Sequence, residues 1–65
     1  MITYGQLVTL FGDEIAWGRV YIRNTEKTEW HNDIERRESI RLYGDRAVKR
    51  VITGYHFLIV WVEAA

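Results

Sequence analysis

Few side chains in this 65-residue sequence could hold a metal ion. The candidates are His31, Asp33 and His56. His31 and Asp33 share a face only where the chain is extended, and His56 belongs to a different predicted strand. A metal site needs several imidazole, thiolate or carboxylate ligands at workable spacing, and the sequence has no cysteine. We therefore expect no metal site and interpret both histidines as surface residues.

Residues for covalent or acid–base catalysis are equally sparse. Ser39 is the only serine, and it lies in a charged segment without the flanking glycines of a nucleophile elbow. The acids at Asp13–Glu14 and at Asp33 and Glu35 have positions typical of helix ends and loops. An acid–base pair would need one buried and one solvated carboxylate. The glycines are isolated, which argues against a phosphate-binding loop. We expect no enzymatic activity and no cofactor.

Aromatic side chains form the strongest pattern. Three Trp, four Tyr and two Phe are more than a core of this size can easily hide. Large side chains alternate with small aliphatic ones in two predicted strands. If the small residues face the helices, the large ones share the far face, together with flanking arginines. The predicted partner-binding residues are Trp17, Arg19, Tyr21, Arg23, Phe57, Ile59 and Trp61.

Two interpretations of this pattern remain open. Monomeric proteins seldom leave such an apolar patch in water, and Trp, Tyr and Arg are enriched at binding hot spots. The pattern therefore favours a contact face for a protein. Alternatively, the large aromatics form the core, with Trp17 and Tyr21 under a helix and the arginine stems covering their edges.

The distribution of charged residues along the chain indicates a second candidate binding surface. Nine basic and nine acidic residues cancel over the whole chain, so composition alone gives no case for nucleic acid or an anionic membrane. The basic residues nevertheless concentrate between Arg36 and Arg50. Such a cluster is usually a solvated face, but Arg36, Arg37 and Arg41 could supply an electrostatic contact.

The elements that must position these residues follow from the spacing of caps and apolar side chains. Thr3 with Gln6, and Asn32 with Glu35, are helix-start signatures. We predict helices over 4–11 and 34–43, the second of them highly solvated. Strands are predicted over 15–23, 28–31, 48–53 and 55–62, with a turn at Gly54 and a bulge or edge in the third strand. The first hairpin should place Trp30 near Tyr21 or Trp17.

These elements predict an α+β fold, comprising a small antiparallel sheet of about four strands in α-β-β-α-β-β order with short helices on one face. We expect residues 1–65 to form a single domain. The longest apolar run, Phe57 to Val62, is far shorter than the roughly 20 residues of a membrane helix. Met1 is not followed by a secretory signal pattern. A cytoplasmic protein without membrane contact is therefore expected.

Two stretches resemble small uncharacterised proteins of phages and mobile elements of Gram-positive bacteria. They are the opening Ile2-Thr3-Tyr4-Gly5-Gln6-Leu7 with Leu10-Phe11-Gly12-Asp13, and the later Tyr43-Gly44-Asp45-Arg46-Ala47-Val48. This resemblance implies a class of compact proteins that includes anti-CRISPR and other anti-defence inhibitors. Such proteins bind a larger host protein stoichiometrically.

The sequence therefore predicts a non-catalytic binding protein, with a phage-type inhibitor of a host protein as the first hypothesis. A single-stranded nucleic-acid binder using the same aromatic and arginine side chains is the second, since aromatic platforms with cations hold single strands. A homodimer whose own interface covers the patch is the third.

Overall fold

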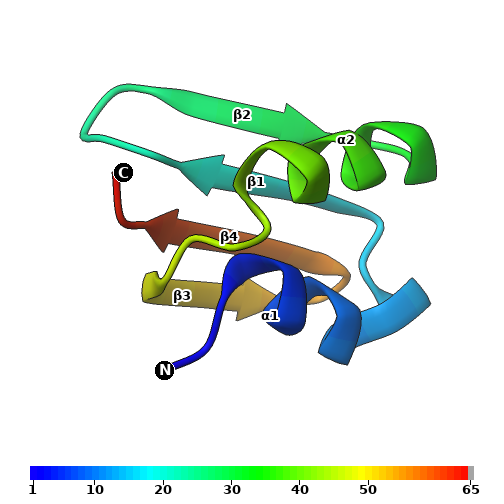
Figure 1. The fold of residues 1–65 in the computed structure, drawn as a ribbon. Helices are drawn as coiled ribbons and strands as arrows, with labels where there is room; N and C mark the ends of the chain where they lie inside the picture. The colour runs from blue at the N-terminus through cyan, green and yellow to red at the C-terminus, as the bar shows by residue number, and fades with distance from the viewer. Residues whose placement is uncertain (65) are drawn as a thin grey trace.

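The computed structural model describes residues 1–64 as two helices packed on one face of a four-stranded sheet (Figure 1). The α+β class with four strands and two helices is therefore confirmed. In chain order the elements are α1 (Tyr4–Phe11), the 3-10 turn η1 (Gly12–Glu14), β1 (Trp17–Tyr21), β2 (Lys27–Trp30), α2 (Asp33–Tyr43), β3 (Val48–Gly54) and β4 (Phe57–Val62). The turn η1 is an addition to the predicted order.

Both helices begin at the caps that the sequence predicts. The Thr3 hydroxyl accepts from the Gln6 backbone amide, and the Gln6 side chain accepts from the Thr3 amide, which completes a capping box. At α2, the Asn32 side chain accepts from the Glu35 amide at 2.9 Å. These bonds satisfy amides that no helical carbonyl reaches, so α1 and α2 start within one residue of their predicted positions.

The prediction of an antiparallel sheet is wrong, because the sheet is mixed. Its strand order is β2-β1-β4-β3, with antiparallel hairpins β1–β2 and β3–β4 and a parallel pair β1–β4 at the centre. The chain leaves β2 at one edge, passes through α2 and enters β3 at the other edge (Figure 1). The return strand β4 then fills the gap beside β1 and runs in the same direction.

The core lies between the sheet and the helices. Small aliphatic side chains of the two central strands are buried there against α1, including Val20, Leu58 and Val60, which are at most 1% exposed. Trp30 is also buried here, so its expected place near Tyr21 or Trp17 is wrong. It pairs with Gly18, and its indole occupies the space that a side chain at residue 18 would need.

A buried hydrogen-bond chain joins three elements behind the sheet. The Trp30 indole donates to the Tyr4 hydroxyl at 3.0 Å, and Tyr4 and Ser39 share a hydrogen bond of 2.9 Å. Ser39 in turn donates to the Arg36 carbonyl. Burial raises the pKa of Tyr4 above its usual value, although its bonds to Ser39 and Trp30 oppose the shift. Ser39 is therefore a packing residue that ties α2 to α1 and β2.

The turn between β3 and β4 differs from the prediction. Gly54 ends β3, and Tyr55 and His56 make the turn, so the last strand starts at Phe57 rather than at residue 55. His56 adopts a positive φ of 63°, which is uncommon for a residue with a side chain. Its Nδ1 lies 2.8 Å from the Glu14 carbonyl, and its own carbonyl accepts from the Ala16 amide. These contacts hold His56 in the strained conformation.

Within residues 1–64, no helix has the length and apolar character needed to cross a membrane.

Candidate functional site

The face of the sheet opposite the helices carries the predicted large side chains. Along β1 and β4 the outward residues are half-buried and the inward ones are buried, in strict alternation. The structure thus brings together six residues, which we call the aromatic face: Trp17, Arg19, Tyr21, Phe57, Ile59 and Trp61. The large aromatics of β1 and β4 therefore do not form the core, whose aromatic members are Tyr4 and Trp30.

Strand register arranges the aromatic face in three rows across the sheet. Because β1 and β4 are parallel and in register, each outward residue of one strand stands beside an outward residue of the other. The rows extend to the edge strands through the pairings with β2 and β3. The first row consists of Trp17 and Phe57. Read from β2 to β3, the second row consists of Glu29, Arg19, Ile59 and Ile52. The third row, read in the same direction, consists of Lys27, Tyr21, Trp61 and Arg50.

The two aromatic rows are stacked pairs. The rings of Trp17 and Phe57 have centroids 5.1 Å apart and planes at 14°, and those of Tyr21 and Trp61 are 5.0 Å apart at 9°. Neighbouring strands are about 4.8 Å apart, so each ring rests on the ring of the adjacent strand. This is the cross-strand pairing that stabilises sheets.

Each stacked ring also has a neighbour other than its stacking partner. His31 stacks on Trp17 with centroids 6.4 Å apart, and the Arg50 guanidinium lies 4.9 Å from the Trp61 ring centre. The Phe57 ring lies against Gly54, where a Cβ atom would come within 2.3 Å of it. A further planar group that stacked on Trp17 or Trp61 would compete with His31 or Arg50 for the ring.

Arg19 occupies the middle of the aromatic face. Its guanidinium lies 5.8 Å from the Trp17 ring centre and 5.9 Å from that of Tyr21, and its Nε donates to Glu29 at 3.0 Å. Glu29 also pairs with Lys27 at 3.3 Å. The Lys27 hydrogen bond, followed by the charge of Arg19, lowers the pKa of the Glu29 carboxyl. Glu29 therefore holds both cations in place at the β2 side of the face.

The outer side of the sheet is basic although the chain is neutral. Within the three strand rows, Arg19, Lys27 and Arg50 stand there with Glu29 as their acidic counterpart. Acidic residues instead gather on the helix side, in and around η1 and α2. The strand rows on the aromatic side are thus net basic, whereas α2 carries three acidic and three basic side chains and η1 adds two acids.

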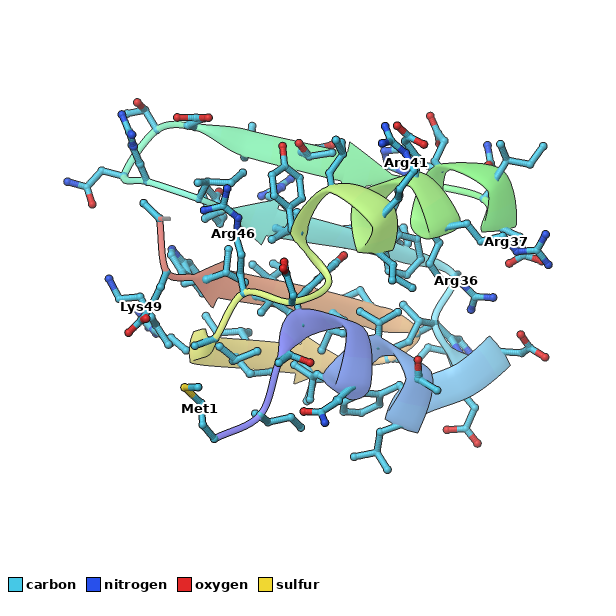
Figure 2. The ribbon with its side chains drawn as sticks, viewed as in Figure 1. Met1, Arg36, Arg37, Arg41, Arg46 and Lys49 are labelled. Atoms are coloured by element: carbon cyan, nitrogen blue, oxygen red, sulfur yellow. The ribbon has the colours of Figure 1, made fainter. Side chains whose placement is uncertain are left out.

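The remaining predicted arginines lie elsewhere. Arg23 follows β1 in an exposed loop and lies 3.9 Å from Glu26. Figure 2 shows Arg36, Arg37 and Arg41 on α2, in the helical layer, which covers the face of the sheet opposite the aromatic face. The structure therefore does not place these three beside the aromatic face.

Two of the α2 arginines make contacts within the chain. Arg36 donates to the Gly12 carbonyl at 3.0 Å and lies 3.3 Å from Asp33, with only 14% of its side chain exposed. Arg41 forms an ion pair with Glu38, which raises the pKa of the arginine. Arg36 is thus an internal tie between α2 and the end of α1.

Sequence reasoning missed the contribution of the edge strands. Lys27, Glu29, Arg50 and Ile52 complete the rows, but no local pattern marks them as partners of the aromatic residues. Only the order of the strands brings them there. Among residues 1–64, no group of three or more His, Cys, Asp or Glu side chains could hold a metal ion.

Comparison of the chain with protein families, with curated proteins and with solved structures finds no match. The interpretation of the aromatic face therefore rests on its geometry.

Proposed function

We propose that the protein acts by binding a larger protein stoichiometrically through the aromatic face. The observation that carries this proposal is the paired state of the rings. Stacking between Tyr21 and Trp61, and between Trp17 and Phe57, makes the face rigid before any partner arrives. A rigid surface loses little side-chain entropy on binding, and Trp, Tyr and Arg are the residue types that dominate binding energy.

The charges on the outer side define the chemistry of the partner. Three cations against one carboxylate favour a surface that combines apolar contacts with acidic residues, since complementary potentials steer association. The same charges disfavour pairing of two copies through this face, because the excess of cations in one copy would face the same excess in the other. The resemblance to phage and mobile-element proteins supports a host protein as the partner, within the anti-CRISPR or anti-defence class.

Capture from nuclease-treated bacterial lysate tests the proposal. The native chain, Trp17→Glu and the control Tyr55→Glu would be immobilised in equal amounts and the bound proteins quantified by mass spectrometry. Tyr55 is 88% exposed and lies in the β3–β4 turn, so its variant adds the same charge outside the face. We expect one host protein to be retained in equimolar amount by the native chain and Tyr55→Glu, and reduced at least about tenfold by Trp17→Glu. Equal retention by all three would contradict the proposal.

A single-stranded nucleic acid remains a second candidate partner, because the outer side of the sheet is basic. Base stacking on Trp17 or Trp61 would compete with the neighbours that these rings already have. Fluorescence anisotropy with a labelled oligothymidine at low and moderate salt tests this candidate. Binding that weakens steeply with salt, and that Trp17→Glu removes, would support it over a protein partner. No binding would eliminate it.

A further inference from the structure

The edge strand β3 exposes apolar side chains on both faces of the sheet. Val51, on the helix side, is 38% exposed, and Ile52, on the outer side, is 39% exposed. β3 is the longest strand, with seven residues, and β4 is its partner on one side only. An edge strand with free peptide groups is a template for another strand. The opposite edge strand, β2, instead carries the outward charges of Lys27 and Glu29.

The alternation of an antiparallel ladder decides which peptide groups of β3 point away from β4. Gly54 pairs with Phe57 across a two-residue turn, and in such hairpins the flanking pair exchanges hydrogen bonds. Two residues back, Ile52 therefore also directs its N–H and C=O to β4. Val51 and Thr53 direct theirs away from the sheet.

The N-terminal segment covers only the start of this edge. The Val48 amide donates to the Ile2 carbonyl at 3.0 Å, and an isolated bridge joins Thr3 to Ala47. The bulge also lies at this end, between Val48 and Arg50. The regular part of the edge, from residue 50 to 54, is therefore not covered by the N-terminal segment and can pair with a further strand.

We propose that β3 pairs antiparallel with β3 of a second copy of the chain, with Ile52 opposite Ile52. In this register Val51 of each copy stands opposite Thr53 of the other. All the outward N–H and C=O groups of these two residues are then used, in four hydrogen bonds. The Ile52 pair falls between them at the closer spacing of a non-hydrogen-bonded pair, about 4.5 Å between Cα atoms, so the two side chains contact one another.

The charges of β3 suit pairing with itself. Its cations, Lys49 and Arg50, lie at the start of the strand, and its last residues are uncharged. Antiparallel pairing about Ile52 sets Arg50 opposite Gly54 of the second copy, so that no cation stands opposite another. Like charges directly opposite would destabilise the pair. The self-complementary register is the reason for preferring a second copy over an unrelated extended peptide.

The two-fold axis of this dimer is perpendicular to the sheet. The two sheets join into one of eight strands, and both aromatic faces lie on the same side. The contact is small compared with the roughly 1,200 Å² of a standard interface. The association is therefore expected to be weak and to need high protein concentration. The inference rests on the edge of the sheet and is independent of the proposed function.

Sedimentation equilibrium between about 20 µM and about 1 mM tests the dimer. The native chain should associate over this range. Val51→Pro should stay monomeric, because it removes an outward N–H that β4 does not use. Ile52→Lys should also stay monomeric, because it sets two cations at the centre of the contact. Thr25→Lys, which adds the same charge in the exposed β1–β2 turn, should associate like the native chain. A native chain that is monomeric at about 1 mM would overturn the proposal.

Amide hydrogen exchange of the native chain locates the contact. Exchange at Val51 and Thr53 should slow as concentration rises, whereas Arg50 and Ile52 should be protected throughout. Trp17→Glu, which disables the proposed binding face, should associate normally. If Trp17→Glu abolishes association and Val51→Pro does not, the aromatic face makes the contact and the edge proposal is wrong.

Discussion

The ring of Trp61 lies on the ring of Tyr21, with centroids 5.0 Å apart and planes at 9°. These residues are 40 positions apart in the sequence and meet because β4 lies parallel to β1 in register. The Arg50 guanidinium covers the Trp61 ring from the other side. A row of side chains from four strands is thus fixed before any partner binds, which is the basis of the proposed docking surface.

The Tyr21–Trp61 stack should contribute a measurable coupling energy. A double-mutant cycle of Tyr21→Leu and Trp61→Leu, followed by urea unfolding, should give a coupling of about 0.5–1.5 kcal/mol beyond lost burial. The cycle of Tyr21→Leu with Phe57→Leu is the control, because these residues lie in different rows. Equal coupling in both cycles would contradict the row arrangement.

The two glycines under aromatic rings should respond differently to alanine. At Gly18, a Cβ would lie 2.3 Å from the indole of Trp30, which is 2% exposed and enclosed by the core. We expect Gly18→Ala to cost about 2–3 kcal/mol of unfolding free energy, as in other overpacked cores. At Gly54 the obstructing Phe57 ring is half-buried and can move toward solvent at the expense of its stack on Trp17, so the loss should be smaller, about 1 kcal/mol. Urea unfolding of both variants measures the difference, and the reverse order would contradict the packing described.

Removal of the Tyr4 hydroxyl should affect both stability and its pH dependence. Tyr4→Phe leaves the buried indole N–H of Trp30 without its acceptor, which should cost about 1–3 kcal/mol. The pKa of Tyr4 is raised in the folded state, so folding favours the protonated phenol. The contribution of Tyr4 to the free energy of unfolding is therefore at its full value below a pH of about 10, the pKa of an unfolded tyrosine. It decreases as the pH rises above that value. The native chain should therefore lose more stability than Tyr4→Phe between about pH 9 and 11. Parallel losses would contradict the raised pKa.

Substitution of the neighbouring residues Arg36 and Arg37 on α2 should affect stability differently and should leave partner binding unchanged. Arg36→Ala removes the bond to the Gly12 carbonyl from a side chain that is 14% exposed. It should cost about 1–2 kcal/mol. Arg37→Ala, at an exposed position, should change stability by less than about 0.5 kcal/mol. Neither variant should alter partner capture at a temperature where both are folded. Loss of capture by Arg37→Ala would instead indicate a contact in the helical layer.

Local signals were enough to predict the helices and the alternation of the strands. The caps at Thr3 and Asn32 and the alternating runs around Val20 and Val60 act over a few residues, and the structure follows them. The division of each central strand into a side of small residues and a side of large ones could also be predicted, because the two kinds alternate without a break. Which of the two sides faces the helices stayed open, since both arrangements satisfy the same alternation.

Strand order could not be predicted, because it depends on pairings between distant segments. The alternation of small and large side chains along β1 and β4 is equally compatible with an antiparallel sheet. No short-range sequence signal therefore indicates that β4 lies beside β1. The position of Trp30 was missed for a related reason. The Trp30 indole fills the space above Gly18. The sequence shows that residue 18 has no side chain, but it does not indicate which aromatic ring packs over it. The edge-strand contribution of Arg50 and Lys27 to the outer side depends on the same pairings.

Site-specific photocrosslinking tests the docking face most directly. A photoreactive benzoyl-phenylalanine would replace Ile59 at the centre of the aromatic face, or Leu10, which is 76% exposed on α1 in the helical layer. Both proteins would be irradiated in bacterial lysate after circular dichroism confirms their folding. We predict a crosslink to one host protein from position 59 and none from position 10. Crosslinks from position 10 alone, or none from position 59 while the chain still captures that protein, would contradict the account.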